Sequence, residues 1–502
     1  MAGIDAKTAE VIVVGAGNAA LAAALSAAES NVQVLVLEKA RRGERGGNTA
    51  ISSGIFRHIH NGKSDIMRLV DGVTQREWKN ISVRPYRPRK LYDEVMELSK
   101  GRADPILSKT WINNSYTTVA WMKEALGVEF ILNNNFTSKP SGTKQFLGPE
   151  VVRAKAGGPG LSSRLFSKCE TNQHIRIQYG AAVDGLIIAA GTVKGVRAKV
   201  NGKRVELKSR AVVLGSGGFE ASKSLRSKFM GPRWRKAKVR GTRHNDGRTL
   251  LAAMKAGAEL YGDMSGCHAT QIDLRSSEYG NLKLGDRTSR YSWQYGVLVN
   301  KGGRRFADEG EDFIEIAYAK LGKRVLEQKD AVAYQVFDQK TAKLLEKDYK
   351  TMSPITALSL AQLGAKIDID AAQLQKTIEE FNAKAGKGPF NPKVKDGCST
   401  RGISPQKTNW AQPLNNPPFV VYPVTCGVTF TYGGIRINEK AKVMRGKGGH
   451  VKGLYAAGEI TGGFFYGGYP RGSGLTRGAV FGRIAGMEAA KFACGDMGGK
   501  DQ

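Results

Sequence analysis

Three small residues near the start of the chain, Gly15, Gly17 and Ala20, form a GxGxxA pattern directly after the β-branched run Val11–Val14. In such a pattern the first glycine allows a tight turn, the second lets a phosphate approach the backbone, and the small third residue lets helix and strand pack closely. The N–H groups at the start of the following helix then favour negative charge. Glu38 follows about 20 residues later, where an acidic side chain accepts hydrogen bonds from ribose hydroxyls. The spacing predicts a dinucleotide-binding site.

The pattern serves both NAD and FAD, and the far end of the chain favours FAD. Gly458 and Glu459 end an apolar segment that starts at Leu454, and a second glycine-rich stretch opens a helix at Gly474 and Leu475. Two distant segments that return to the first domain are expected when a long dinucleotide lies across the whole sheet. The positive end of a helix starting at Gly474 suits the pyrimidine end of a flavin, because it stabilises the anionic reduced form.

These residues need a doubly wound sheet to position them. Apolar runs and an alanine-rich segment predict a strand–helix–strand unit over residues 11–37. The remaining predicted elements are a helix over 104–126, strands over 175–189, 193–200, 211–214 and 296–300, a helix over 370–384, an irregular segment over 386–418, a strand over 453–456 and a closing helix over 474–492.

The bulk composition describes a large globular protein with a strongly basic surface. The chain has 502 residues, 41% of them hydrophobic, which is enough for two or more domains. Lysine and arginine total 77 against 45 aspartate and glutamate, so the formal net charge is +32. Such a surplus favours a small anionic substrate or docking to an acidic or membrane-bound redox partner, although it also fits a surface that only confers solubility. The basic residues are scattered and no nucleic-acid-binding motif is visible, so no nucleic acid partner is expected.

The cysteines and the start of the chain limit which metal or haem sites, and which cellular compartment, can be expected. The five cysteines include no CxxC spacing, which excludes ordinary thiolate-held iron–sulfur or zinc sites and a CxxCH haem attachment. No metal site is expected, and the odd count suits a reducing compartment. The start of the chain has no signal-peptide pattern, and the apolar run over 19–28 is too short to span a bilayer. The expected location is therefore cytoplasmic.

Six motifs occur in order across nearly the whole chain: GAGNAALAAALSAAE…LEK, GGNTAISSG, AVVLGSGGF, GVLVNKGGRRFADEGEDF, VTCGVTFTYGG and LYAAGEITGG…YPRGSGLTRGAVFGRIAG. Together they resemble the flavoprotein family of fumarate reductase, succinate dehydrogenase and 3-ketosteroid Δ1-dehydrogenase, and within it most closely the tricarballylate dehydrogenases. The resemblance implies an α/β fold in which a Rossmann-like FAD-binding domain, residues 1–265 and 424–502, is interrupted by an α+β capping domain, residues 266–423. It also implies that the substrate lies between the two domains, at the flavin ring.

The resemblance also implies how the cofactor is attached. Covalent members hold FAD through a His just before a Thr in the glycine-rich loop, and here Asn48 precedes Thr49. Non-covalent FAD is therefore expected. The residues expected to bind it are Gly15, Gly17, Ala20, Glu38, Lys39, Gly47, Asn48, Thr49, Ser53, Gly54, Ala182, Gly217, Gly458, Glu459, Gly474 and Leu475.

Desaturating a C–C bond requires a hydride acceptor, a base, and positive groups or hydrogen-bond donors that bind the activating carboxylate or carbonyl. His268, in GCHATQ, is similar to the family's carboxylate-binding His-Pro-Thr segment, although Ala269 replaces the Pro and a structural core histidine is the alternative. Arg471 falls where fumarate reductases carry an arginine that clamps a carboxylate, a task that suits a guanidinium fork. The tricarballylate relatives usually have Gly at that position.

Two further residues are assigned by resemblance. Tyr469, in YPRGSG, is similar to a Tyr of the ketosteroid enzymes that polarises a carbonyl together with a backbone N–H, which Gly474 would supply here. The alternative for Tyr469 is an aromatic side chain packed beside the flavin. Arg290 lies roughly where a cap arginine enters the family's proton relay, with the spacing off by a few residues.

The predicted cap departs from the family at the proton-transfer residue. Fumarate reductases and tricarballylate dehydrogenases carry an arginine shortly after RFxxE, whereas Phe313 and Ile314 occupy this stretch here. Either Tyr318, Tyr469 or Glu315 transfers the proton, or the substrate is not a fumarate-type dicarboxylate.

Three functions remain open on the sequence. The first is an FAD-dependent dehydrogenase that makes an alkene next to a carboxylate or carbonyl of a small, tricarballylate-like anion. The second is the reverse, an ene-reductase of the fumarate reductase kind, and the third is a flavin-binding electron-transfer subunit without its own substrate. The sequence has no haem or iron–sulfur motif and no second complete NAD fingerprint, so an external electron acceptor or donor is expected.

Overall fold

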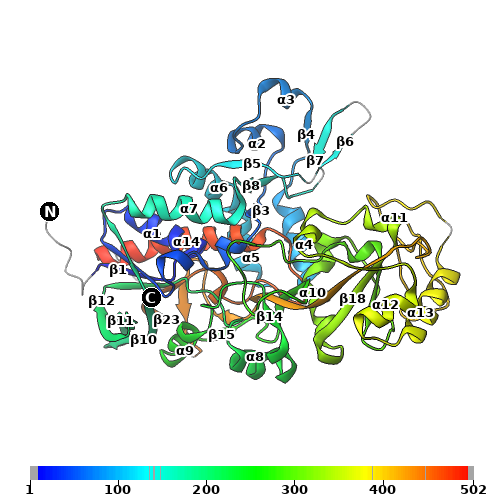
Figure 1. Ribbon diagram of the computed structural model, residues 1–502. Coiled ribbons are helices and arrows are strands. Elements are labelled where there is room, and N and C mark those ends of the chain that lie inside the picture. Colours follow the sequence, from blue (N-terminus) through cyan, green and yellow to red (C-terminus); the bar gives the residue numbers. More distant parts are fainter. Residues whose placement is uncertain are drawn as a thin grey trace. The chain divides into compact units, whose positions relative to one another are not determined.

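The computed structural model describes residues 9–495 except 135, 139–141, 147, 387 and 447 (Figure 1). By its internal contacts the chain divides into two units. The first comprises Met1–Leu225, Gly241–Cys267 and Phe430–Gln502, and the second comprises Arg226–Arg240 and His268–Thr429. The segment Arg226–Arg240, which precedes the predicted cap in sequence, groups with the second unit.

A nine-stranded sheet forms the centre of the first unit. Its parallel part has the order β23, β13, β1, β2, β9, and the alanine and valine side chains of β1 and β13 are buried. Apolar strands of this kind need cover on both faces, as in doubly wound folds. The α/β class is therefore confirmed. The strands are β1 (Val11–Val14), β2 (Val34–Glu38), β9 (Ile175–Tyr179), β10 (Ala181–Ala189), β11 (Thr192–Val200), β12 (Lys203–Lys208), β13 (Ala211–Leu214), β22 (Lys442–Met444) and β23 (His450–Ala456).

Helices from the two ends of the chain lie side by side on this sheet, α1 (Asn18–Ala28) in blue and α14 (Ser473–Cys494) in red in Figure 1. Glycines let them approach closely, since a Cβ added at Gly482 would lie 2.3 Å from the Ala19 carbonyl oxygen, and one at Gly486 would lie 2.1 Å from that of Ala23. The C-terminal segment therefore returns to the first strand–helix–strand unit, as predicted.

The outer part of the first unit carries short helices and three small sheets. The predicted helix over 104–126 is wrong as a single element, because the backbone of Asn114 leaves the α region (φ −92°, ψ 1°) and separates α5 from α6. The helices are α2 (Lys63–Leu69), α3 (Gln75–Lys79), α4 (Pro88–Ser99), α5 (Pro105–Asn113), α6 (Ser115–Glu124), α7 (Gly157–Glu170) and α9 (Arg248–Lys255). The strands are β3 (Ile55–Phe56), β4 (Ile81–Val83), β5 (Phe130–Leu132), β6 (Thr137–Ser138), β7 (Lys144–Phe146), β8 (Val152–Ala154), β15 (Leu260–Tyr261) and β21 (Gly434–Ile435).

The second unit is built on a six-stranded sheet around the long strand β20 (Phe419–Thr431). Its other strands are β14 (Lys238–Val239), β16 (Cys267–Asp273), β17 (Val297–Asn300), β18 (Val332–Phe337) and β19 (Ile355–Ala357). Its helices are α10 (Ile314–Leu326), α11 (Gln339–Ala342), α12 (Leu360–Ile367) and α13 (Ala371–Lys384), and α8 (Lys223–Met230) leads into it. An apolar core of valines from β17, β18 and β20 packs on Leu363, Ile378 and Phe381 of α12 and α13. No helix within the described residues is long and apolar enough to cross a bilayer.

Candidate FAD and substrate site

The turn between β1 and α1 has the geometry that its three small residues predict. Gly15 has φ +98°, and a Cβ on it would lie 2.6 Å from the carbonyl oxygen of Gly215 at the end of β13. Ala20 is fully buried, and a Cβ on Gly215 would meet the Ala20 Cβ at 2.8 Å. By contrast, a Cβ on Gly17 would meet only the Thr49 hydroxyl oxygen, at 3.6 Å. Gly15 and Ala20 are thus required by the protein's own packing, whereas Gly17 leaves space for a ligand.

Asn18, the first residue of α1, joins three of the predicted cofactor segments. Its backbone N–H donates to the Thr49 hydroxyl at 2.9 Å, and its side-chain amide donates to the Leu475 carbonyl oxygen at 2.8 Å. The N-terminus of α1 has no side-chain cap, and the buried Asn18 Oδ1 has no hydrogen-bond partner among the described residues. The first glycine-rich turn, the loop around Thr49 and the start of α14 therefore meet at one place with unused polar groups. These residues fit FAD.

Replacing Gly17 by alanine is expected to weaken FAD binding about tenfold or more without unfolding the protein. The new methyl group fits the empty space, where it would hold the pyrophosphate away from the backbone. The measurement is the Kd of FAD from quenching of flavin fluorescence, together with the Tm of the protein without added cofactor. Gly15→Ala is the matched control and should lower the Tm itself, because its Cβ collides with the backbone of Gly215. Equal FAD affinity in Gly17→Ala and the wild type would contradict the assignment.

The remaining predicted cofactor residues divide into side chains with polar roles and turn glycines. Glu38 is buried at the end of β2 and accepts from the Ala40 N–H at 2.7 Å; burial raises the pKa of its carboxyl, and backbone N–H groups counteract this. Lys39 forms an ion pair with Asp246 at 2.6 Å. The turn residues Gly47 and Gly54 have positive φ, Ser53 lies between them, and Ala182 lies on β10.

Asn48 and Glu459, both predicted from the sequence, lie together with two residues that were not. The Asn48 amide nitrogen lies 2.9 Å from Glu220 Oε1 and 3.4 Å from Glu459 Oε2. The amide nitrogen of Asn245 donates to the same two carboxyl groups, at 2.7 and 3.3 Å. A Cβ on Gly217 would meet the Asn245 amide at 2.4 Å, whereas one on Gly458 would meet the Ala19 Cβ at 2.8 Å. Glu220 directly follows GSGGF, and this position was the only sequence signal for it.

The start of α14 carries a pair of hydrogen-bonding groups. The Tyr469 hydroxyl accepts from the Gly474 N–H at 2.9 Å, so the two groups predicted to polarise a carbonyl are adjacent. The Tyr469 ring is packed by Phe430 and Phe465, at centroid distances of 5.0 and 5.1 Å. Burial raises the pKa of Tyr469, so the hydroxyl stays protonated and acts as a donor rather than a base.

Arg471 is held by a buried carboxylate that the sequence did not reveal. Its Nε lies 3.5 Å from Glu150, whose other oxygen lies 3.5 Å from Arg57. Arg57 also donates to the Arg471 carbonyl oxygen at 2.7 Å and pairs with Glu94 at 2.7 Å. The Arg471 side chain is 31% exposed while Glu150 is 2% exposed, so Glu150 orients a guanidinium that a ligand can reach.

Arg477, in the second turn of α14, is a cation that the sequence did not single out. It is buried, donates to the Thr461 hydroxyl at 3.0 Å and lies over the Phe464 ring at 4.2 Å. Burial lowers the pKa of its guanidinium to about 10, although the nearby Glu459 opposes this. The arginine in SGLTR was visible in the sequence, but its burial was not.

In the second unit, His268 lies on β16 and is 1% exposed, with its ring edge-to-face with Tyr318 at 4.7 Å. Burial and the neighbouring Arg240 hold the pKa of His268 well below its usual range, so the imidazole is neutral. Arg240 pairs with Asp286 and donates to the Thr429 hydroxyl at 3.0 Å. Arg240 is therefore the cation beside His268, and the sequence did not indicate it.

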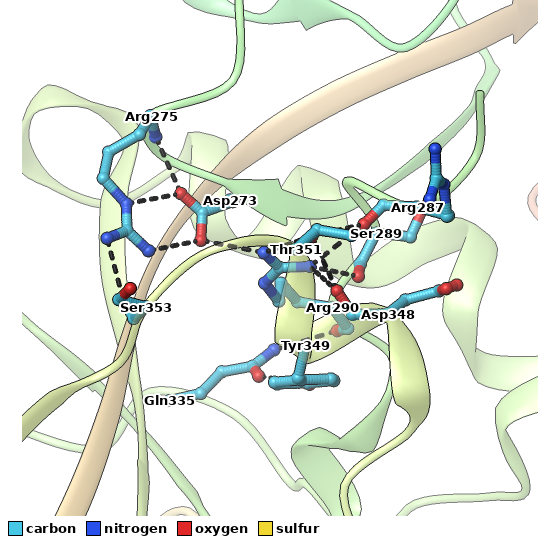
Figure 2. A network of polar contacts seen from close by, with 10 residues as sticks. All are labelled: Asp273, Arg275, Arg287, Ser289, Arg290, Gln335, Asp348, Tyr349, Thr351 and Ser353. Carbon is cyan, nitrogen blue, oxygen red and sulfur yellow. Dashed lines mark hydrogen bonds and ion pairs between the residues drawn. The ribbon is translucent and has the colours of Figure 1, made fainter. Parts of the chain in front are cut away.

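Arg290 is surrounded by residues of the second unit that bind its guanidinium (Figure 2). It is fully buried and pairs with the equally buried Asp273 at 3.0 Å. It also donates to the Ser289 carbonyl oxygen at 2.9 Å and lies over the Tyr349 ring at 5.2 Å. In Figure 2 its guanidinium joins β16 to the segment around Asp348 and Thr351. These contacts give Arg290 a role in stabilising the second unit and do not favour the predicted relay.

The other proton-transfer candidates are also in the second unit. Tyr318 lies on α10, where it contacts His268 and the Tyr291 ring, the latter at 5.6 Å. Phe313, at the position of the family arginine, packs on Trp410 at 5.6 Å. The side chain of Glu315 lies outside the described part of the structure.

Comparison with known proteins identifies the family to which the chain belongs. Residues 10–476 match the family described as "FAD binding domain". The chain is 27% identical to fumarate reductase (cytochrome) of Shewanella frigidimarina, over 97% of this chain and 78% of the relative, and 27% identical to urocanate reductase of Eggerthella lenta, over 96% and 75%. The fold is similar to the open conformation of a flavocytochrome c3 fumarate reductase, with a TM-score of 0.73 and 24% identity over 97% of this chain and 79% of that one. The chain belongs to the FAD-binding flavoprotein family of the fumarate reductases and is an FAD-dependent oxidoreductase acting on CH–CH groups.

Proposed function

We propose that this flavoprotein moves a hydride to or from a carbon adjacent to a carboxylate or carbonyl group of a small anionic substrate. The observation that carries the proposal is the start of α14, where the Tyr469 hydroxyl, the Gly474 N–H and the guanidinium of Arg471 come from one short segment. Donors and a cation in one segment suit a group on which negative charge develops during the reaction.

The residues of the first unit have separable roles in this proposal. FAD, when bound, supplies the hydride acceptor or donor. Tyr469 and Gly474 donate hydrogen bonds to the activating oxygen of the substrate, and Arg471 clamps a carboxylate through its planar fork. Glu150 keeps the guanidinium oriented before the substrate arrives.

Residues of the second unit contribute donors and the proton. We infer that His268, held neutral, donates a hydrogen bond to the substrate, and that Arg240 supplies the positive charge that a neutral imidazole lacks. Tyr318, in contact with His268, is the favoured acid or base, because the raised pKa of Tyr469 suits a donor.

We propose a small, tricarballylate-like polycarboxylate as the substrate, because Arg471 and the net charge of +32 favour an acidic substrate. Dehydrogenation is the direction that we propose. Ene reduction is the second candidate. The names of two relatives, fumarate reductase and urocanate reductase, favour it directly. An external carrier must exchange electrons in either direction. FAD is proposed to be non-covalent because Asn48 offers no imidazole, and denaturation should then release the flavin into the supernatant.

An anaerobic flavin titration tests the proposal and the direction. The oxidised protein is mixed in turn with small polycarboxylates and ketones, and the reduced protein with the corresponding alkenes, while the visible flavin absorbance is followed. Bleaching by a saturated compound supports the dehydrogenase, and recovery of colour with an alkene but no bleaching supports the reductase. If neither occurs with any compound, the protein is a flavin-binding electron-transfer subunit and the proposal is wrong.

A further inference from the structure

Two carboxyl groups from distant parts of the first unit share their hydrogen-bond donors. Glu220 follows β13, and Glu459 follows β23. Each receives hydrogen bonds from the side-chain amides of both Asn48 and Asn245, over N···O distances of 2.7–3.4 Å. Both amide nitrogens reach the same two oxygens, Glu220 Oε1 and Glu459 Oε2, and the two carboxyl groups also share a side-chain hydrogen bond, so they are neighbours. Two adjacent carboxylates that are shielded from water repel each other strongly.

Glycines let the backbone approach Glu459 and the amide of Asn48 closely. A Cβ on Gly218 would lie 2.2 Å from Glu459 Oε1 and 2.3 Å from the Thr431 hydroxyl oxygen. A Cβ on Gly241 would lie 2.4 Å from Asn48 Oδ1, which also accepts from the Thr242 N–H at 2.9 Å. Glu459 and the shared donor Asn48 are therefore both held in place by closely packed backbone.

We propose that Glu220 is a positioning residue of the FAD site, which keeps a proton and donates it in a hydrogen bond to Glu459, so that Glu459 is the single anion presented to the cofactor. The pair then carries one negative charge, and its remaining oxygens hold the amides of Asn48 and Asn245 in place. The inference rests on FAD binding by this family and not on the substrate or the direction of hydride transfer.

The surroundings decide which partner holds the proton. Glu459 is partly exposed and accepts from the Thr431 N–H at 2.9 Å and from its hydroxyl at 3.3 Å, and the charge of Arg477 favours its ionised form. Glu220 is fully buried, and the charged group that faces it is Glu459. Burial raises the pKa of both groups, and for Glu220 the charge of Glu459 raises the pKa further. Glu220 is therefore the acid and Glu459 the carboxylate.

The first test compares Glu220→Gln with Glu459→Gln by the Kd of FAD near neutral pH. Glutamine has the shape of a protonated glutamic acid, and its NH2 group still donates to Glu459. The Kd of FAD for Glu220→Gln should therefore stay within about threefold of the wild-type value. Glu459→Gln should weaken FAD binding tenfold or more. Glu220→Met removes both donor and acceptors and should also weaken binding. Equal losses in the two glutamine variants would overturn the assignment, and so would the reverse order.

The second test follows stability against pH without FAD. A carboxyl whose pKa is raised on folding from its ordinary value of 4.5 holds a proton that the unfolded chain releases, so stability falls as pH rises from 4.5 to the native pKa. In that window the unfolding constant of the wild type should rise tenfold per pH unit relative to that of Glu220→Gln. Glu220→Gln should therefore be the more stable protein at pH 8. Parallel profiles of stability against pH for the two proteins would overturn the proposal. The proposal would also be wrong if the infrared spectrum of Glu220→Gln kept every protonated carboxyl band of the wild type.

Discussion

Replacing Arg471 by alanine is expected to lower kcat/KM for a carboxylate substrate by about 100-fold or more, a loss of roughly 3 kcal/mol, while FAD remains bound. The guanidinium is the partly exposed cation of the α14 segment, and its loss leaves the substrate carboxylate without a charged partner. Steady-state kinetics and the flavin-to-protein absorbance ratio together measure the effect.

The buried Glu150 makes the choice of controls important for this prediction. The substitution takes away one of the two arginines beside Glu150. Arg57 remains 3.5 Å from Glu150, so the protein should still fold. Arg471→Lys keeps the charge without the fork and should recover only part of the activity. Arg436→Ala, which breaks a half-exposed ion pair with Glu259 at 3.3 Å, is the matched control and should retain wild-type kinetics. Unchanged kinetics in Arg471→Ala would exclude the carboxylate clamp.

The parts of the site that the sequence predicted are those in which the backbone itself approaches the ligand. Gly15, Gly17 and Ala20 have roles that depend on the absence or small size of a side chain, and that property is visible in the residue type at a fixed spacing. The observed turn assigns Gly15 and Ala20 to packing against Gly215 and leaves open space beside Gly17. The start of α14 was predictable for the same reason.

The parts that the sequence did not predict depend on contacts between distant segments. In the sequence, Glu220, Glu150 and Arg240 look like ordinary charged residues. Each acquires its role from residues in other segments of the chain, as Glu150 does from Arg57 and Arg471. Arg290 shows the same dependence on a distant partner. Its position predicts a relay, and the structure adds a buried ion pair with Asp273 that the sequence did not indicate. The single helix predicted over 104–126 was wrong for a local reason. An asparagine can also lie inside a helix, so the residue type of Asn114 did not reveal the break between α5 and α6.

Replacing Tyr469 by phenylalanine is expected to lower kcat by about 10²- to 10³-fold with a smaller change in KM, because it removes a donor aimed at charge that develops in the transition state. The ring should stay in place, since Phe430 and Phe465 contact its carbons at centroid distances of 5.0 and 5.1 Å. The Gly474 N–H loses its present partner, the Tyr469 hydroxyl, but can still bind the substrate oxygen. FAD binding should be unaffected.

The size of this effect distinguishes two roles for the Tyr469 hydroxyl. If it only caps the Gly474 N–H, its loss costs about 1 kcal/mol of stability and leaves kcat nearly unchanged. If it also polarises the substrate, kcat falls in addition to this small loss of stability, and substrates with a more strongly electron-withdrawing group next to the reacting carbons should be less affected. Tyr466→Phe is the matched control, because Tyr466 lies in the same loop with its ring against Arg102 at 4.8 Å. If kcat decreases in both variants, the loop is disturbed. If it decreases only in Tyr469→Phe, the hydroxyl donor itself is responsible.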